Sequence, residues 1–200
     1  MNRNRNSNGR GVVLATLACL MLVAGTGLAE PEVVWIGENY PTDINADGTV
    51  VVGNRANGTY DVFRWTAETG VVELGQSSAQ TIQTGSGTPD VSDDGLHVSA
   101  SVVDADTLYL TQGIWTKGLG WQYALPPIPP SGGIVDGQLA SAWGLSGDGT
   151  TISGFFWRPD HGGYEEDGLS NANTWNRTDS TFVHLPTPRR NCRANDTNYD

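Results

Sequence analysis

The chain alternates short apolar runs with clusters of Gly, Asn, Asp, Ser and Pro, and its β-branched and aromatic residues are concentrated in the runs. No stretch repeats apolar residues at the i, i+3, i+4, i+7 spacing of an amphipathic helix. This pattern is typical of strands joined by tight turns. It therefore predicts an all-β chain, with strands expected at 33–36, 49–55, 60–66, 71–74, 96–103, 108–116, 121–125, 150–157, 172–178 and 181–185.

One stretch occurs three times, as INADGTVVVG at 44–53, VSDDGLHVSA at 91–100 and LSGDGTTISG at 145–154. Each copy places an Asp-Gly pair before a run of β-branched residues. Gly adopts positive φ without steric cost, and Asp can accept hydrogen bonds from its own backbone, so each pair predicts a tight turn that leads into a strand. The expected turn residues are Asp47, Gly48, Asp94, Gly95, Asp148 and Gly149.

A second feature repeats in step with the first. Trp65, Trp115 and Trp175 each lie in a later strand, before a turn and an apolar run that ends in leucine. This frame predicts three repeat units at about 30–78, 79–130 and 131–190. Residues 194–200 match residues 142–148, so 191–200 is expected to begin a fourth, incomplete repeat of a longer or truncated array.

Repeat units of this size and strand content predict an antiparallel array, a partial β-propeller of about three blades. The three tryptophans are then expected to fill the space between neighbouring blades.

The first unit, INADGTVVVGNRANGTYDVFRWTAETGVVELG, resembles one unit of the HAF-type extracellular repeat proteins. The second and third units depart from that motif at Ala100, Ile114 and Thr174. The resemblance implies a β-propeller-like array on a secreted bacterial protein, and it brings no catalytic residue. The Asp-Gly stretch also resembles the units of TolB-like propellers. The positions that match the HAF motif are Asn45, Asp47, Gly48, Val51, Gly53, Phe63, Trp65, Gly70, Leu74 and Gly75.

The N-terminal residues have the pattern of an export signal. Three arginines precede an apolar run, and Gly27-Leu28-Ala29 supplies the small residues that a signal peptidase reads, so 1–29 is expected to be cleaved. The whole chain carries 22 acidic and 11 basic residues, a net charge of −11, which disfavours nucleic acid and anionic membranes as partners. We expect a bacterial protein that is secreted or held at the cell surface, with no membrane contact beyond the signal.

Asp43-x-Asn45-x-Asp47-Gly48 has the spacing of the first half of a calcium loop, which makes Asp43, Asn45 and Asp47 candidate Ca²⁺ ligands. The twelfth position is Asn54 rather than Glu, and a strand rather than a helix follows. A structural Asp-Gly turn is therefore favoured, and no cofactor is expected.

Two functions remain open at this point. The favoured one is a non-enzymatic scaffold that presents loops to a protein or glycan ligand, or to further repeats of its own array. The alternative is a carbohydrate-acting propeller hydrolase, whose carboxylates would have to lie about 5–10 Å apart. The candidates for that role are Asp94, Asp104, Asp106, Glu165 and Glu166.

Overall fold

The computed structural model describes residues 33–56, 61–77, 87–125, 140–157, 170–185 and 193–197. The chain divides into two units, Met1–Trp35 and Ile36–Asp200. The first unit is described only at 33–35, where the backbone is irregular, and the expected signal at 1–29 lies outside the described residues. All of the strands belong to the second unit.

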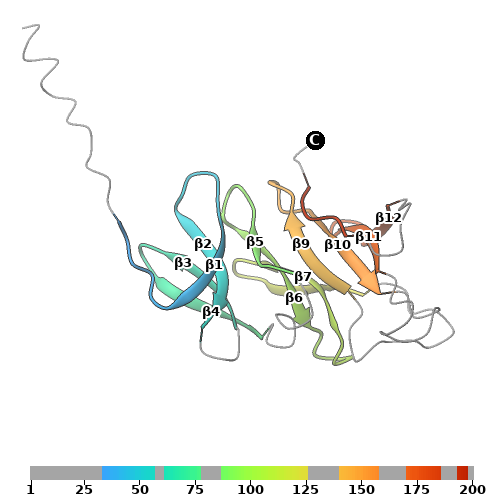
Figure 1. The fold of residues 1–200 in the computed structure, drawn as a ribbon, viewed down its shortest axis with the longest axis horizontal. Coiled ribbons are helices and arrows are strands. Elements are labelled where there is room, and N and C mark those ends of the chain that lie inside the picture. The colour runs from blue at the N-terminus through green and yellow to red at the C-terminus, as the bar shows by residue number, and fades with distance from the viewer. Residues whose placement is uncertain are drawn as a thin grey trace, which may run out of the picture. The chain divides into compact units, whose positions relative to one another are not determined.

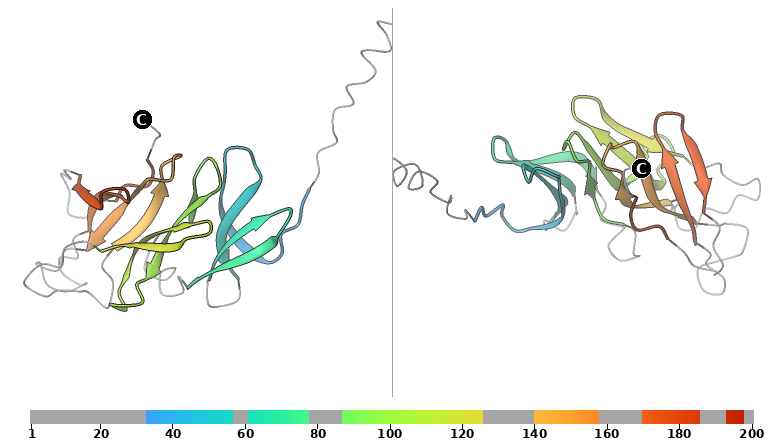
Figure 2. Two further views of the ribbon diagram at one scale, coloured as in Figure 1. Left: turned by 180° about the vertical axis from the view of Figure 1, so that it is seen from behind. Right: turned by 90° about the horizontal axis from the view of Figure 1, so that it is seen from above.

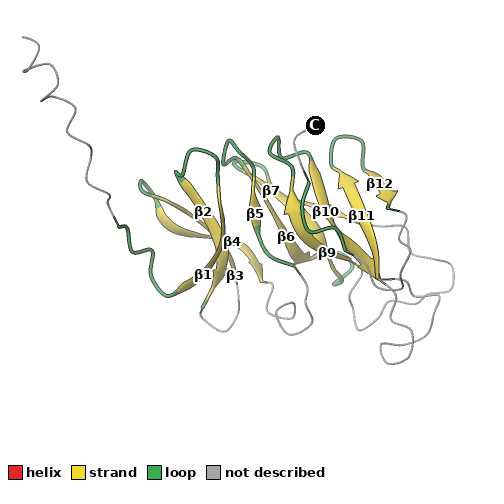
Figure 3. Cartoon of the chain, turned by 45° about the horizontal axis from the view of Figure 1, so that its top comes forward, coloured by secondary structure: helices red, strands yellow, loops and turns green. Residues whose placement is uncertain are grey.

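The described strands form three antiparallel sheets of four strands, each sheet following chain order (Figure 1). The described residues contain no helix (Figure 3), and hence none that could span a membrane. The prediction of an all-β array of three propeller-like blades is confirmed. Sheet 1 holds β1 (Asn39–Ile44), β2 (Val50–Arg55), β3 (Asp61–Thr66) and β4 (Gly70–Ser77); sheet 2 holds β5 (Asp90–Val91), β6 (His97–Val103), β7 (Leu110–Thr116) and β8 (Gly120–Ala124); sheet 3 holds β9 (Ala140–Leu145), β10 (Thr151–Trp157), β11 (Ser170–Asn176) and β12 (Thr181–His184).

The three sheets pack in series (Figure 2). An apolar layer fills each junction. Between sheets 1 and 2, Val52 and Val62 meet Val98 and Val102, all fully buried. Between sheets 2 and 3, Ile114, Ala124, Ala142, Leu145, Ile152 and Trp175 form the second layer. The middle sheet therefore contributes to both layers, one on each face.

The first strand of each sheet was not among the strands expected from the sequence. Residues 33–36, expected to be extended and paired, form no strand, and β1 begins instead at Asn39. Pro41 lacks a backbone donor and the register shifts between Pro41 and Asp43, which restricts such a strand to a sheet edge. These edge strands, β1, β5 and β9, are called the inner strands below, because they contact one another at the sheet junctions.

The inner strands explain a glycine in the repeat. A Cβ at Gly53 would overlap the carbonyl oxygen of Tyr40 on β1, and one at Gly154 would overlap that of Ser141 on β9. In sheet 2 the ladder between β5 and β6 ends at the pair Asp90–Ser99, and the next residue, Ala100, is fully buried in the core. The Gly-to-Ala departure in the second repeat thus coincides with a short inner strand.

Candidate functional site

The three Asp-Gly turns share one side-chain hydrogen bond. One carboxylate oxygen accepts the N–H two residues on, at 2.9 Å in each case: Asp47 from Thr49, Asp94 from Leu96 and Asp148 from Thr150. The glycine that follows has a φ of 76° at Gly48, 68° at Gly95 and 69° at Gly149. Each turn leads directly into the second strand of its sheet.

These hydrogen bonds keep the turn carboxylates ionised. The side chain and backbone N–H of Thr49 hold the pKa of Asp47 below its ordinary value, and Ser146 and Thr150 do the same for Asp148. At Asp94 burial opposes the effect, but hydrogen bonds from Ser92 and Leu96 still lower the pKa. A carboxylate in this setting is an acceptor and a poor proton donor near neutral pH.

The turn glycines of sheets 2 and 3 also touch the preceding sheet. A Cβ at Gly95 would lie 2.5 Å from Val50 Cγ2, and one at Gly149 would overlap the ring of His97. The corresponding glycine of sheet 1, Gly48, has only the end of the Ile44 side chain near it, at 4.0 Å. Two of the three turns are therefore also contacts between sheets.

This difference predicts unequal effects of alanine in the turns. Both Gly48→Ala and Gly149→Ala place a side chain at positive φ, a cost of about 1–2 kcal/mol. Gly149→Ala adds the overlap with His97, so its loss of unfolding free energy should exceed that of Gly48→Ala by a further 1–3 kcal/mol, roughly. Urea titrations of the two variants measure this difference. Equal losses would mean that the third turn does not rest on sheet 2.

The repeat tryptophans occupy equivalent positions in β3, β7 and β11, paired across the sheet with Val51, Val98 and Ile152. Trp175 is buried, at 1% exposed, and its ring lies 6.3 Å from that of Phe182. Trp115 is half-buried against the layer between sheets 1 and 2. Trp65 is half-buried, and among the described residues no sheet precedes its own.

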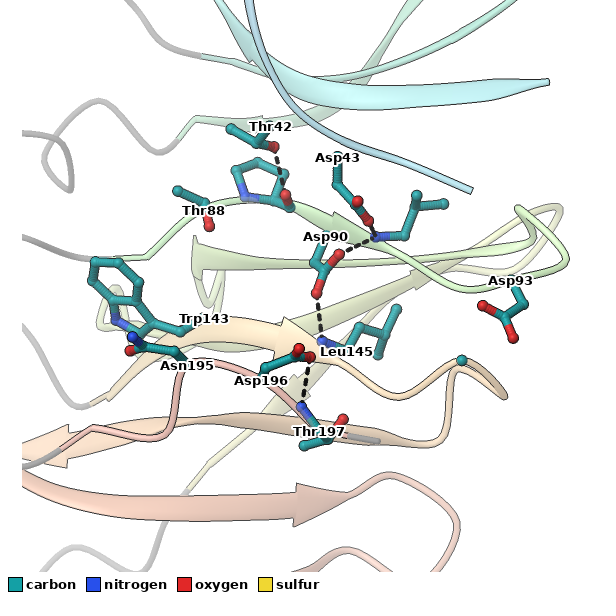
Figure 4. A pocket seen from close by; sticks show the side chains of 13 residues that line it. Thr42, Asp43, Thr88, Asp90, Asp93, Trp143, Leu145, Asn195, Asp196 and Thr197 are labelled. Carbon is teal, nitrogen blue, oxygen red and sulfur yellow. Dashed lines mark hydrogen bonds between the residues drawn. The ribbon is translucent and has the colours of Figure 1, made fainter. Parts of the chain in front are cut away.

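Carboxylates on the inner strands link one sheet to the next (Figure 4). Asp43 on β1 accepts the N–H of Val91 on β5 at 2.8 Å, and Asp90 on β5 accepts the N–H of Leu145 on β9, also at 2.8 Å. Thr42 adds a hydroxyl hydrogen bond of 2.5 Å to the carbonyl of Pro89. Asp43 and Asp90 occupy the same position of successive repeats, so the same type of side chain joins both junctions.

The two carboxylates also face each other. The N–H of Val91 donates to Asp43 at 2.8 Å and to Asp90 at 3.0 Å, so both acids converge on one nitrogen. Burial, and then the neighbouring Asp43 carboxylate, raise the pKa of Asp90 to about 8. At neutral pH Asp90 is therefore protonated in the folded chain.

A pocket of about 440 Å³ opens beside this pair. Residues from β1, β5, β9 and the segment 193–197 line it (Figure 4). Its acidic groups are Asp43, Asp90, Asp93 and Asp196. Trp143 provides its aromatic wall, with the guanidinium carbon of Arg193 lying 3.7 Å from that ring's centre. We call this the inner-strand pocket.

A second polar cluster ties sheet 2 to sheet 3. Arg177 donates to Thr116 Oγ1 at 2.8 Å and lies 3.1 Å from His97 Nε2, which must accept because a guanidinium has only donors. Burial and the Arg177 charge lower the pKa of His97, while Asp94 and Asp148 oppose them. His97 is therefore neutral in the folded chain near pH 7.

The remaining residues singled out from the sequence do not gather at one site. Asn45 accepts two backbone N–H groups of its own turn, and Asp43 points to the next sheet, so the three candidate calcium ligands serve separate hydrogen bonds. Asp104 caps its turn through Thr107, and its pKa is lowered by that side chain. Glu165 and Glu166 lie outside the described residues. Within the part of the chain that is described, no three His, Cys, Asp or Glu side chains cluster as a metal site would.

Comparisons with known proteins give structural neighbours only. No model of a known protein family matches the sequence, and no curated protein matches it. Among solved structures, TolB from Acinetobacter baumannii aligns over 76% of this chain and 33% of its own, with 14% identity and a TM-score of 0.48. A protein described as TolB from Agrobacterium tumefaciens aligns over 73% of this chain and 48% of its own, with 12% identity and a TM-score of 0.47. The chain thus spans less than half the length of either.

Sequence reasoning did not identify Asp90 or Trp143 as site residues. The signal for Asp90 was present, because Asp43 and Asp90 stand at the same distance before the turn Asp of their repeats. For Trp143 the repeat holds no signal, because the corresponding residues of the other two units are Thr42 and Pro89, neither of which is aromatic.

Proposed function

We propose that this chain is a secreted, non-enzymatic β-repeat scaffold of the HAF-repeat kind, which binds a glycan or protein ligand outside the cell or at its surface. The observation that carries the proposal is the inner-strand pocket. Its walls come from the same position of successive repeats, so the repeat itself builds the concave surface. Export rests on the basic start and apolar run of residues 1–29.

The carboxylates of the repeat favour a structural role over a catalytic one. Asp47, Asp94 and Asp148 each accept a backbone N–H, and their lowered pKa values make them poor general acids. Asp43 and Asp90 accept N–H groups across sheet junctions. These side chains are occupied in holding the turns and the sheets together.

One observation favours the hydrolase alternative: Asp90 has a pKa of about 8 beside a second carboxyl, the pattern of an acid poised to donate a proton. The geometry argues against a glycosidase pair. Both acids reach one nitrogen at 2.8 and 3.0 Å, which places their oxygens too close to hold a sugar and its nucleophile between them. The scaffold is therefore the better-supported function.

The pocket suits a neutral, hydroxyl-rich ligand. It combines the Trp143 ring with several hydrogen-bonding side chains, among them Thr42, Thr88 and Asn195. An aromatic wall with a few convergent polar groups is the usual composition of a small-ligand site. A glycan chain is the ligand that we propose to test first.

The test is binding of the purified chain to insoluble bacterial cell-wall polysaccharide, together with an assay for released reducing ends. We expect binding without sugar release, and Trp143→Ala should weaken binding by about tenfold or more, equivalent to about 1.4 kcal/mol. Leu119→Ala, at a turn residue that is 85% exposed, is the matched control, and melting curves check that both variants fold. Sugar release that Asp90→Asn abolishes would favour the hydrolase, and no binding to glycan or protein would refute the scaffold.

A further inference from the structure

Each sheet carries one apolar row that crosses all four strands at the same register. The pairing places one residue from each strand side by side, and the third member is always the repeat tryptophan. We call these the inter-sheet rows. They are Ile44, Val51, Trp65 and Val71 in sheet 1; Val91, Val98, Trp115 and Trp121 in sheet 2; and Leu145, Ile152, Trp175 and Phe182 in sheet 3.

The rows of sheets 2 and 3 are packed against the preceding sheet. The row of sheet 2 joins the layer with Val50 and Val52, and the row of sheet 3 joins the layer with Ile114 and Ala124. The exposure of the first residue of each row differs accordingly: Val91 is 6% exposed and Leu145 is 5% exposed, whereas Ile44 is 55% exposed. Among the described residues no sheet covers the row of sheet 1, which we call the open row.

The opposite face of each sheet receives the next row. In the strands these receiving positions alternate with the row, so they point to the other side of the sheet. Val52 and Ile114, which are fully buried, are receiving positions of sheets 1 and 2. The equivalent row of sheet 3 pairs Ser153, Thr174 and Val183, and Val183 is 53% exposed. Among the described residues, no sheet covers the row of sheet 1, and the receiving row of sheet 3 is buried at Ser153 but exposed at its outer end, Val183.

We propose that the open row of sheet 1 is an interface for a second copy of this chain, which covers it with the outer face of its own sheet 3. The same kind of contact already joins sheet 1 to sheet 2 and sheet 2 to sheet 3. Two copies that exchange this contact form a closed pair with two-fold symmetry. The described residues of the pair form six sheets, within the range of about 4–8 blades that closes a propeller.

The segment 193–197 marks the place on sheet 3 where an inner strand is accepted. Ala194 donates its N–H to the carbonyl of Gly154 on β10 at 3.1 Å. At the junction between sheets 2 and 3, Ala142 of β9 donates its N–H to the Ser101 hydroxyl of β6 at 2.9 Å, and Ser101 is one residue beyond Ala100, which corresponds to Gly154. Asp196 also stands at the repeat position of Asp43.

The charge of the chain sets the conditions for association. Each copy carries a net charge of −11, so two copies repel each other at long range. The open row is apolar, and in the pair it meets Val183 in the receiving row of sheet 3. Salt screens the repulsion and leaves the apolar contact in place, so association should strengthen as the salt concentration rises.

The experiment is sedimentation velocity of the full chain over a range of concentrations, at low and high salt. We expect a monomer–dimer equilibrium that high salt favours. Ile44→Asp and Val183→Asp should each raise the dissociation constant by about tenfold or more, because a carboxylate would be buried without a partner. Both positions are more than half exposed in the single chain, so the folded monomer should tolerate the changes. Leu119→Asp, on the turn between β7 and β8, is the control that should leave association unchanged.

Mixing the two variants gives the sharper result. An Ile44→Asp copy keeps its receiving face, and a Val183→Asp copy keeps its open row, so the mixture should dimerise through one intact contact more strongly than either variant alone. A monomer at every concentration and salt level would overturn the proposal. A dissociation constant that neither substitution raises, or that only Ile44→Asp raises, would overturn it too, since the head-to-tail contact needs both surfaces.

Discussion

Replacing Trp175 with alanine is expected to lower the free energy of unfolding by about 3–5 kcal/mol. The side chain is 1% exposed and packs with Ile114, Leu145 and Phe182 between sheets 2 and 3. Removing the indole would leave a cavity in the centre of that layer, which the neighbouring strands cannot fill because their backbones are held by the sheet. Urea denaturation followed by far-UV circular dichroism measures the loss.

The matched substitution is Trp65→Ala, at the same repeat position in sheet 1. Trp65 is only half-buried, and the described residues place no sheet before its own, so its loss should be below about 2 kcal/mol in dilute solution. Trp115→Ala should fall between the two. An equal loss of unfolding free energy for Trp65→Ala and Trp175→Ala would contradict a packing in which the tryptophan of sheet 3 is covered by another sheet and that of sheet 1 is not.

The second large effect is a loss of stability on the alkaline side. Asp90 has a pKa of about 8 in the folded chain against an ordinary value of 3.8, so the folded state binds one proton more than the unfolded state between these values. Stability is then greatest at the acid end of this window and falls as pH rises towards 8. His97 and the turn carboxylates have lowered pKa values, so they reduce the stability of the folded state only as pH falls and they become protonated.

Each pH unit in this window corresponds to about 1.4 kcal/mol for a single proton, so a loss of about 2 kcal/mol is expected between pH 6.5 and 8. Asp43→Asn removes the neighbouring charge and should flatten the decline. Asp106→Asn, on the exposed turn after β6, should leave it unchanged. Urea midpoints measured across this range test the prediction. Stability that stays level or rises with pH would mean that Asp90 is ionised in the folded chain.

The sequence was sufficient to predict the parts of the fold that repeat locally. The Asp-Gly turns and the tryptophan strands are each encoded by a few neighbouring residues, and the described strands after each turn lie within a few residues of their expected bounds. The inner strands were missed because their residues lack an apolar alternation. β1 reads Asn-Tyr-Pro-Thr-Asp-Ile, and β5 has only two residues, so tertiary contacts rather than propensity hold them extended.

The role of Asp43 could not be read from its own surroundings. In the sequence it is the first acid of a partial calcium-loop pattern with Asn45 and Asp47. In the fold its partner is the N–H of Val91, 48 positions away, and only the juxtaposition of two inner strands brings them together. Asp43 and Asp90 stand at equivalent positions of their repeats, but that equivalence does not say which N–H group each carboxylate meets.

Inner-strand carboxylates join the sheets in series as equivalent blades. Hydrogen exchange of the Val91 and Leu145 amides, resolved by NMR, tests this arrangement most directly, because each N–H donates to an Asp of the preceding sheet. We predict that both amides exchange slowly, and that Asp43→Ala speeds exchange at Val91 while leaving Leu145 protected. Fast exchange at both amides in the unmodified chain, at the rate of an exposed turn, would contradict the account.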